Sequence, residues 1–230
     1  MSSQKKVPAH LAQFRHAIVA VDIVVFAIKD GRLMTLLLKL TRPPFEHAWA
    51  LPGGLIAPTE NLEQAVVRHI DYKTGLKNTY FEQLYTFADI ERDPRGRVVS
   101  VAHLALLGNA EAAILSLAPE YGAIEWFDTD KLPELAYDHA AIIETARERL
   151  KAKLGYTNIA QHLLPSSFSL SDLQKAYEIV LGHPLDKRNF RKKLLALDII
   201  TETTGKSTGA FRPAQLYRFK DKKAKIIEIL

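Results

Sequence analysis

The segment from Glu60 to Lys73 carries charged side chains at helical spacing and is the part of the sequence best suited to hold a metal ion. Glu60, Glu63 and Asp71 offer carboxylate oxygens, which are the ligands that Mg²⁺ prefers. The adjacent pair Tyr72-Lys73, however, offers a phenol and an ammonium group, which do not bind Mg²⁺ at neutral pH. On a helix, Asp71 points about 100° away from Tyr72, and binding of a stray cation by Asp71, Glu60 or Glu63 is the alternative. The segment therefore predicts no dedicated magnesium site.

A second candidate for chemistry is a strongly basic segment near the C-terminus. Five of its seven residues are cationic: Lys187, Arg188, Arg191, Lys192 and Lys193. Phe190, Leu194 and Leu197 form an apolar face on the same predicted helix, so the basic side chains are expected to point outward. Phosphate contacts from these residues would give salt-dependent affinity for nucleic acid. Asn189 lies near the start of this helix, where recognition helices meet base edges, and Asn can bond adenine bidentately; a local capping role is the alternative.

The overall charge points to the same end of the chain. Residues 1–155 hold 18 Lys+Arg and 19 Asp+Glu, whereas residues 156–230 hold 13 and 7, so the last third carries the whole excess behind the net charge of +5. A basic segment joined to a near-neutral one suggests a polyanion-binding module, with a solvated basic surface as the alternative.

Composition excludes several other classes of protein. The 47% apolar and 25% charged residues are typical of a soluble globular protein, and the absence of cysteine excludes disulfides and thiolate metal sites. The longest apolar runs have the length of strands, so we expect no contact with a membrane. The N-terminal residues lack the apolar core of a signal peptide, and the cytoplasm is the expected compartment.

The elements that would position the first segment alternate between strands and helices. Asp30-Gly31 between two β-branched runs in residues 16–40 predicts a hairpin. Residues 60–74 predict a helix that Thr59 caps and Gly75 ends, with Leu62, Ala65, Val66 and Ile70 on its apolar face. Strands are expected at 80–90, 98–107 and 123–128, a turn at 93–96 between the first two, and a helix at 139–153.

The last third has the plan of a winged helix-turn-helix: a helix, a turn, a basic helix and two strands around a basic loop. Ser169 and Asp186 are the expected N-caps of the two helices, and Gly182 ends the first. The strands are IITET and QLYRF, on either side of TGKSTGAFRPA. Gly155 and residues 164–167 mark a boundary region, so we expect two domains, at 1–155 and 156–230.

Several positions of the segment 54–76 resemble the Nudix signature. Gly54, Glu60, Arg68, Gly75 and Leu76 match its spacing after the flanking WALPGG, and Ile70 fills the aliphatic position. The resemblance implies an α+β fold: a Nudix α/β/α sandwich with a mixed sheet, here followed by the winged helix. The acidic position after the Arg is His69, and Tyr72 and Lys73 stand at the two Glu positions that hold Mg²⁺ in Nudix hydrolases. The resemblance therefore implies no catalytic residues and no metal, with Glu60 and Arg68 kept as a buried, fold-holding ion pair.

The resemblance continues through residues 82–106 to the ADP-ribose pyrophosphatase branch of the Nudix proteins. It implies a cleft that holds ADP-ribose intact. The expected ligand contacts are the glycines Gly53 and Gly54, the aromatic residues Trp49, Tyr85 and Phe87 for stacking, and Arg42, Arg95 or Arg97 for the pyrophosphate. Core packing is the alternative for each aromatic residue, and a solvated loop charge is the alternative for each Arg.

A degenerate Nudix domain followed by a winged helix resembles the Nudix-related transcriptional regulators of NAD metabolism, the NrtR family. LDKRNFRKKL and FRPAQLYRF are similar to its DNA-binding half, with Lys187, Arg188, Asn189, Arg191, Lys192, Lys206 and Arg212 as the expected contacts. Membership implies a homodimeric repressor of NAD biosynthesis or salvage genes that binds operator DNA, senses ADP-ribose and requires no cofactor. The alternatives are a nucleotide-sugar pyrophosphatase with a nucleic-acid-binding appendage and an RNA-binding adaptor.

Overall fold

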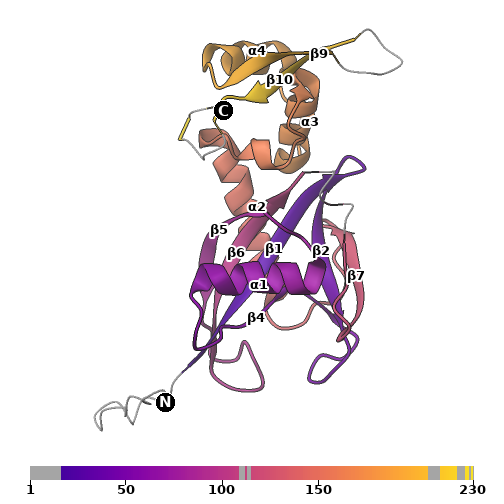
Figure 1. Ribbon diagram of the computed structural model, residues 1–230, viewed down its shortest axis with the longest axis vertical. Coiled ribbons are helices and arrows are strands. Elements are labelled where there is room, and N and C mark those ends of the chain that lie inside the picture. The colour runs from indigo at the N-terminus through magenta and orange to yellow at the C-terminus, as the bar shows by residue number, and fades with distance from the viewer. Residues whose placement is uncertain are drawn as a thin grey trace, which may run out of the picture.

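The computed structural model describes residues 17–108, 112, 115–206, 213–221, 226–227 and 229 of the chain. The N-terminal part is built on one seven-stranded sheet, and the C-terminal part is a smaller unit of helices and three short strands (Figure 1). No helix within these ranges is both long and apolar enough to cross a membrane.

The large sheet has the strand order β3-β2-β1-β6-β5, with β4 paired to β1 and β7 paired to β2. β1 is parallel to β6 and antiparallel to β2 and β4, so the sheet is mixed, as predicted. Its strands are β1 (Ile18–Lys29), β2 (Arg32–Leu40), β3 (Trp49–Ala50), β4 (Gly53–Leu55), β5 (Tyr80–Phe87), β6 (Val98–Leu107) and β7 (Tyr121–Asp128).

The β1–β2 hairpin follows the local sequence directly. Asp30 and Gly31 have φ angles of 50° and 74°, which a two-residue turn of the primed type requires at both central positions. Asp tolerates this region better than most residues, and Gly enters it without a steric penalty. The predicted hairpin is confirmed.

Two helices cover the two faces of the sheet. On one face Val21, Ile23 and Val25 of β1 belong to the same apolar cluster as residues of α1 (Leu62–Thr74). Val24 and Phe26 point to the other face, in a cluster with residues of α2 (His139–Tyr156). Successive side chains of a strand alternate between faces, so β1, buried on both, carries an almost continuous apolar run. This is the predicted α/β/α sandwich.

The start of α1 differs from the prediction. Asn61, not Thr59, is the N-cap: its side-chain oxygen accepts the Gln64 N–H at 2.9 Å, and Gln64 Oε1 accepts the Asn61 N–H at 2.9 Å. This reciprocal capping box leaves Thr59 in the preceding turn. The predicted stop at Gly75 is confirmed, with a left-handed φ of 73°.

Other predicted elements are present with shifted ends. β5 ends at Phe87 instead of residue 90, β7 begins two residues earlier than expected, and α2 continues past Lys153 to Tyr156. Gly155 was expected to mark a boundary, but it lies within α2. Packing of Leu150 and Leu154 in the core keeps this last turn helical despite the glycine.

The C-terminal part matches the predicted plan and adds a strand. Ser169 begins α3 with a capping box to Asp172, Gly182 ends it with φ 79°, and the Asp186 side chain accepts the Asn189 N–H at 2.7 Å to start α4. The third strand, Phe168–Ser169, places the small sheet in the order β8-β10-β9. The elements are η3 (Ile159–His162), β8 (Phe168–Ser169), α3 (Leu170–Leu181), α4 (Lys187–Ala196), β9 (Ile200–Lys206) and β10 (Gln215–Phe219).

The two parts share one apolar core. Leu150 and Leu154 of α2 belong to the same buried cluster as Leu173 and Tyr177 of α3. Near the C-terminus, the Ile229 N–H donates to a carbonyl oxygen of the last turn of α2 at 2.7 Å. Figure 1 shows α2 passing behind the sheet and reaching the C-terminal helices. α2 is therefore the physical connection between the two units.

Candidate functional site

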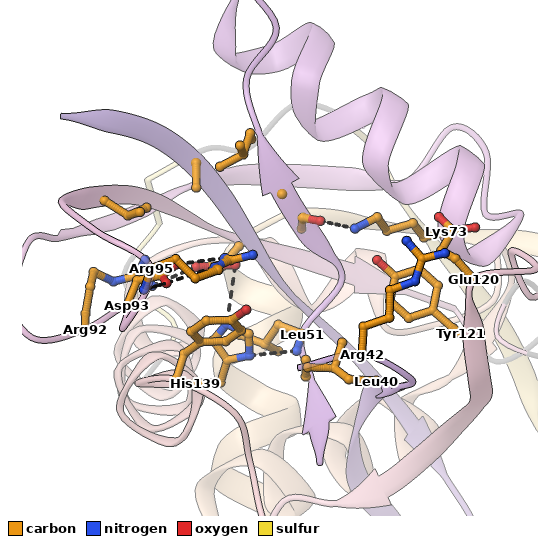
Figure 2. Close-up of a pocket in the computed structure, with 18 of the residues that line it drawn as sticks. Leu40, Arg42, Leu51, Lys73, Arg92, Asp93, Arg95, Glu120, Tyr121 and His139 are labelled. Atoms are coloured by element: carbon orange, nitrogen blue, oxygen red, sulfur yellow. Dashed lines mark hydrogen bonds and ion pairs between the residues drawn. The ribbon is translucent and has the colours of Figure 1, made fainter. Parts of the chain in front are cut away.

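A cavity of about 300 Å³ opens beside the β1–β4 pair (Figure 2). Its walls come from β1 and β4, the last turn of α1, the loops after β2 and before β6, the start of β7 and the start of α2. The charged side chains that line it are Asp22, Arg42, Lys73, Arg92, Asp93, Arg95 and Glu120, and the ring of His139 also lines it. A cavity of this size with mixed charges suits part of a phosphorylated small molecule.

Two glycines allow β4 to lie close to its neighbours. A Cβ atom at Gly53 would lie 2.3 Å from the Val21 carbonyl oxygen on β1. At Gly54, where φ is 152°, it would lie 2.6 Å from Cε1 of His69. Neither position accepts a side chain without movement of the backbone or of a buried ring. The two glycines thus shape the cavity wall.

The last turn of α1 places Tyr72 and Lys73 beside this wall. Lys73 Nζ donates a hydrogen bond to the Gly53 carbonyl oxygen and lies 5.0 Å from the centre of the Tyr121 ring. The Tyr72 hydroxyl donates to Glu120 Oε2 at 3.1 Å. Burial lowers the pKa of Lys73 to about 8, although the carboxylate of Glu120 acts in the opposite direction. No group of three or more His, Cys, Asp or Glu side chains in the described ranges is arranged to hold a metal ion.

Glu60 and Arg68 form the predicted ion pair. Arg68 Nε donates to Glu60 Oε2 at 2.8 Å, and Arg68 Nη2 donates to Glu60 Oε1 and to the Leu55 carbonyl oxygen. Hydrogen bonds from Arg68, with one from the Ala57 N–H, hold the pKa of Glu60 at about 2. The Arg68 side chain is 44% exposed, so the expectation of a buried partner is wrong on this point. The pair fastens the loop before α1 to the helix.

A buried polar network forms the floor of the cavity. Arg92, with 3% of its side chain exposed, donates to both oxygens of Asp138 at 2.9 and 2.7 Å and to Asp22 Oδ2 at 3.0 Å. Ser100 Oγ donates to the same Asp22 oxygen at 2.6 Å. Burial favours the neutral carboxyl, but charge and hydrogen bonds from its neighbours outweigh it, and the pKa of Asp22 falls below its ordinary value.

His139 extends this network to α2. The Leu51 N–H donates to His139 Nδ1 at 3.0 Å, which places the proton of the neutral ring on Nε2. That nitrogen lies 3.4 Å from Asp22 Oδ1. Because Asp138 is the residue before α2 and His139 is its first residue, the cavity floor and the start of α2 are one hydrogen-bonded unit.

Four of the predicted ligand contacts line the cavity: Arg42, Gly53, Gly54 and Arg95. The Arg95 guanidinium donates to Asp93 through Nε at 3.0 Å and Nη2 at 2.7 Å, and its central carbon lies 5.4 Å from the centre of the Tyr137 ring. Arg42 is exposed at the cavity edge. The structure thus brings two of the three predicted pyrophosphate contacts, Arg42 and Arg95, to the same opening as the glycines.

The other four lie away from the lining of this cavity. The Trp49 ring packs edge-to-face on Phe127 at 4.6 Å, as part of the main core. Tyr85 and Phe87 contact each other edge-to-face at 5.5 Å on β5, where the Tyr85 side chain faces solvent. Arg97 donates to the carbonyl oxygens of residues 88 and 89. Core packing, the alternative for the aromatic residues, holds for Trp49 and Phe87 but not for the exposed Tyr85, and contact of these four residues with a ligand stays a prediction.

Sequence reasoning missed the residues of the cavity floor. Asp22, Arg92 and His139 come from three distant segments of the chain, and the sequence around each of them matches no known binding motif. Tyr121 and Tyr137 were missed for the same reason. An isolated Asp within the apolar run of β1 was the one available signal, because a charged residue in a buried strand needs a partner.

The basic face of α4 is the second candidate site. Lys187, Arg188, Lys192 and Lys193 are exposed, whereas Phe190 and Leu194 are buried beneath them. Tyr177 of α3 contacts the Phe190 ring, with centroids 5.1 Å apart, so α3 supports α4 from below. The predicted inward and outward sides of this helix are confirmed at these positions.

Arg191 differs from the other basic residues of α4. It is half-buried, and its Nη2 donates to Ser171 Oγ of α3 at 2.8 Å. Asn189 is exposed, and the N-terminal capping is carried out by Asp186, which accepts the Asn189 backbone N–H. The Asn189 side chain is not the cap of the helix.

Two predicted contacts lie in the wing. The backbone of Lys206 ends β9 and pairs with Gln215 of β10. Arg212 falls outside the described residues, as do the other residues from 207 to 212. The two predicted antiparallel strands are present, but β9 begins at Ile200 and continues through Lys206, three residues into the predicted loop.

These two sites define a class of protein: a Nudix domain with a cationic cavity, joined through one helix to a winged helix with a basic second helix. Comparison with known families agrees, because residues 16–146 match the NUDIX domain and residues 160–219 match the NrtR DNA-binding winged helix domain. The chain belongs to the NrtR family of Nudix-related regulators.

Individual relatives support this membership along most of the chain. An ADPR-responsive transcriptional repressor of Acinetobacter baylyi is 34% identical over 220 residues, covering 92% of this chain and 87% of the relative. NrtR of Shewanella oneidensis, solved in complex with a 27mer DNA, is 35% identical with a TM-score of 0.77, covering 88% of this chain and 93% of that one. The NUDIX domain of the same protein, solved with ADP ribose, is 35% identical with a TM-score of 0.55, covering 60% of this chain and 91% of that one.

The N-terminal part also resembles an enzyme. An ADP-ribose pyrophosphatase of Methanocaldococcus jannaschii is 37% identical over 131 residues, which are 57% of this chain and 73% of the relative.

Proposed function

We propose that this chain is an ADP-ribose-responsive repressor of transcription that acts on genes of NAD biosynthesis or salvage. The main observation behind this proposal is that α2 connects a domain with a cationic cavity to a winged helix whose exposed face is basic. The relatives from Acinetobacter and Shewanella support both halves, because one responds to ADPR and the other has been solved with DNA and with ADP ribose. ADP-ribose is the effector, and no further cofactor is needed.

For the effector, we propose that the cavity holds the pyrophosphate. Arg95 is already oriented by Asp93 and Tyr137, so binding would immobilise few additional groups. Arg42 would close on the ligand from the exposed edge, and Gly53 and Gly54 would let the phosphates approach the backbone of β4. Four further residues remain proposed contacts outside this cavity: Trp49, Tyr85, Phe87 and Arg97.

We further propose that the protein does not hydrolyse ADP-ribose. Tyr72 and Lys73 occupy the signature positions at which Nudix hydrolases carry metal-binding carboxylates, and here they bond to Glu120 and to the Gly53 carbonyl oxygen. Release of AMP from ADP-ribose in the presence of Mg²⁺ or Mn²⁺ should stay at background. The similarity to the Methanocaldococcus enzyme favours the competing function, a pyrophosphatase, and metal-dependent AMP release that Glu60→Gln abolishes would establish it.

For DNA, we propose that a homodimer places α4 of each protomer in the major groove of a two-fold operator. Lys192→Ala should weaken binding to every duplex alike and lower the salt slope by about one. Asn189→Ala should cost about 1–3 kcal/mol on the preferred site and relax base preference there. Arg191, anchored on Ser171, should contact phosphate with little additional ordering. Tighter binding of RNA than of duplex DNA in a gel shift would favour the RNA-binding alternative.

The decisive experiment is a titration of operator DNA with and without ADP-ribose. Coupling between two ligands on one protein is reciprocal and typically amounts to about 1–3 kcal/mol. Saturating operator DNA should therefore change the affinity for ADP-ribose by the factor by which ADP-ribose changes the affinity for DNA. Identical ADP-ribose affinity with and without operator would contradict effector control, even if both ligands bind.

Two coarser assignments complete the proposal. We place the domain boundary after residue 155, between a sensing unit at 1–155 and a DNA-binding unit at 156–230, with α2 contributing to the apolar core that the two units share. A repressor must reach the chromosome, so we assign the protein to the cytoplasm.

A further inference from the structure

Lys73 is a cation of the cavity without an ion-pair partner in the described part of the chain. Arg92 is neutralised by Asp22 and Asp138, and Arg95 is neutralised by Asp93. By contrast, no carboxylate among the described residues lies within 4.0 Å of the side-chain nitrogens of Lys73 or of Arg42. The lining thus retains two cations that are free to meet an anion.

The position of Lys73 is not explained by the needs of its own helix. A Lys in the last turn of a helix commonly stabilises the unpaired carbonyl groups at that end. Lys73 instead extends away from α1, and its Nζ donates to the carbonyl oxygen of Gly53 on β4, at the cavity wall (Figure 2). The ammonium group is therefore directed to the phosphate-binding side of the cavity.

The same surroundings do not fit a divalent cation. Mg²⁺ needs oxygen ligands, but the side chains of this turn of α1 that bond to β4 or to Glu120 are an imidazole, a phenol and an ammonium group: His69, Tyr72 and Lys73. The Glu120 carboxylate already accepts the Tyr72 hydroxyl. A divalent ion placed here would be repelled by Lys73, whereas a pyrophosphate group would be attracted.

We propose that Lys73 is a ligand-binding residue that replaces the divalent cation as counter-charge to the pyrophosphate of a nucleoside diphosphate, so that binding needs no metal. The inference rests on the proposed function, because it assumes that the cavity receives such a ligand. Lys73 and Arg42 together supply two positive charges, which match the two negative charges of a pyrophosphate diester. The lysine supplies no Lewis acid for hydrolysis, so the ligand leaves the cavity intact.

A bound diphosphate should also change the protonation of Lys73. In the free protein, burial lowers its pKa to about 8, against the opposing effect of Glu120 and Asp22, while Arg68 lowers it further. Two further titratable groups face Lys73: Tyr121 presents its ring face to the ammonium group, and His69 has a pKa that burial lowers and the charge of Lys73 lowers further. An anion in contact with Nζ would raise the pKa of Lys73, so binding at pH 8 should take up protons. A lysine with a purely structural role would not produce this uptake.

The test is calorimetric titration of the full chain with ADP-ribose, in EDTA and in Mg²⁺, for the wild type, Lys73→Met, Lys73→Arg and the control Lys77→Met. Lys77 is exposed just beyond α1 and outside the cavity. The wild type should bind equally well in both buffers. Lys73→Met should weaken binding about 10- to 100-fold, as for the loss of one charge-assisted hydrogen bond, and Lys73→Arg should retain most of the affinity. Lys77→Met should bind like the wild type.

Two results would overturn the inference: equal affinity of a folded Lys73→Met variant, or loss of wild-type binding in EDTA. Proton uptake by the wild type at pH 8, measured in buffers of different ionisation enthalpy, tests it without any variant, and its absence would also overturn it. If the wild type does not bind ADP-ribose but binds inorganic pyrophosphate through Lys73, the proposed effector is wrong and the role of Lys73 stands.

Discussion

Replacement of Lys73 by Met should stabilise the ligand-free protein near neutral pH. The Lys73 ammonium is partly buried, and burial lowers its pKa from 10.5 to about 8. At about 1.4 kcal/mol for each pKa unit, this difference corresponds to about 3 kcal/mol by which the folded state disfavours the charged side chain. Replacement by Met removes this penalty, but it also removes the hydrogen bond to Gly53, which offsets about 1 kcal/mol of the stabilisation. Met has a similar length and no charge, so a net gain of about 2 kcal/mol is expected.

The pH dependence makes this prediction specific. At pH 7, Lys73 is charged in both the folded and the unfolded protein, and the full penalty is present. Between about pH 8 and pH 10.5 the unfolded state binds the additional proton, so wild-type stability rises with pH from this group. Lys73→Met lacks this rise, and its advantage over the wild type should disappear as the pH approaches 10.5.

Urea denaturation of both proteins without ligand, at pH 7 and pH 10, measures the difference in free energy of unfolding. Lys77→Met is the matched control, because Lys77 is exposed, and its stability should follow that of the wild type at both pH values. A Lys73→Met variant that is less stable than the wild type at pH 7 would refute the reasoning. So would a gain of the same size at pH 10.

Two further predictions concern the network and the cap that the structure revealed. Arg92→Met leaves Asp22 and Asp138 near one another without their shared cation, and it should lower the free energy of unfolding by about 3–5 kcal/mol in urea denaturation; a loss below 1 kcal/mol would show that water satisfies both carboxylates. Asn61→Ala should cost about 1 kcal/mol by thermal or urea unfolding, whereas Thr59→Ala should cost almost nothing, and the reverse order would restore Thr59 as the cap.

Elements specified by neighbouring residues could be predicted from the sequence. Asp30-Gly31 meets the backbone demands of its turn, and Ser169 with Asp172 contains a complete capping box within four residues. The same kind of signal was present at Asn61, which precedes the first apolar residue of α1 and has Gln64 three positions later. The error there lay in choosing between two polar residues, Thr59 and Asn61, that are two positions apart.

The cavity could be predicted only in part. The glycines and Lys73 belong to a local pattern, and their position relative to α1 follows from it. Asp22, Arg92 and Asp138 come together only through tertiary packing, because they lie on β1, on the loop after β5 and at the start of α2. No spacing of residues in the sequence predicts that these three side chains lie close together.

The orientation of the predicted aromatic contacts could not be predicted from the sequence either. A strand alternates its side chains between two faces, so one residue of register decides whether a ring meets the core, a ligand or solvent. Trp49 lies on a two-residue strand whose direction depends on its pairing with β2. Tyr85 follows an irregularity in the pairing of β5 with β6, which alters the alternation. Neither feature has a signal in composition or periodicity.

The length of the helix α2 would convert a small tilt at one of its ends into a larger displacement at the other. Its 18 residues span about 27 Å, at about 1.5 Å for each residue. A tilt of about 5° at the end that holds Asp138 and His139 would displace the other end by about 2 Å over this length. That end packs in the core beneath the winged helix, so a small displacement of residues around a ligand would become a larger displacement of the basic surface. The stiffness of α2, rather than any residue in contact with ligand or DNA, would then set the strength of the coupling between the two sites. A protein with a more flexible middle of α2 would bind both ligand and DNA, but binding of one would not affect binding of the other.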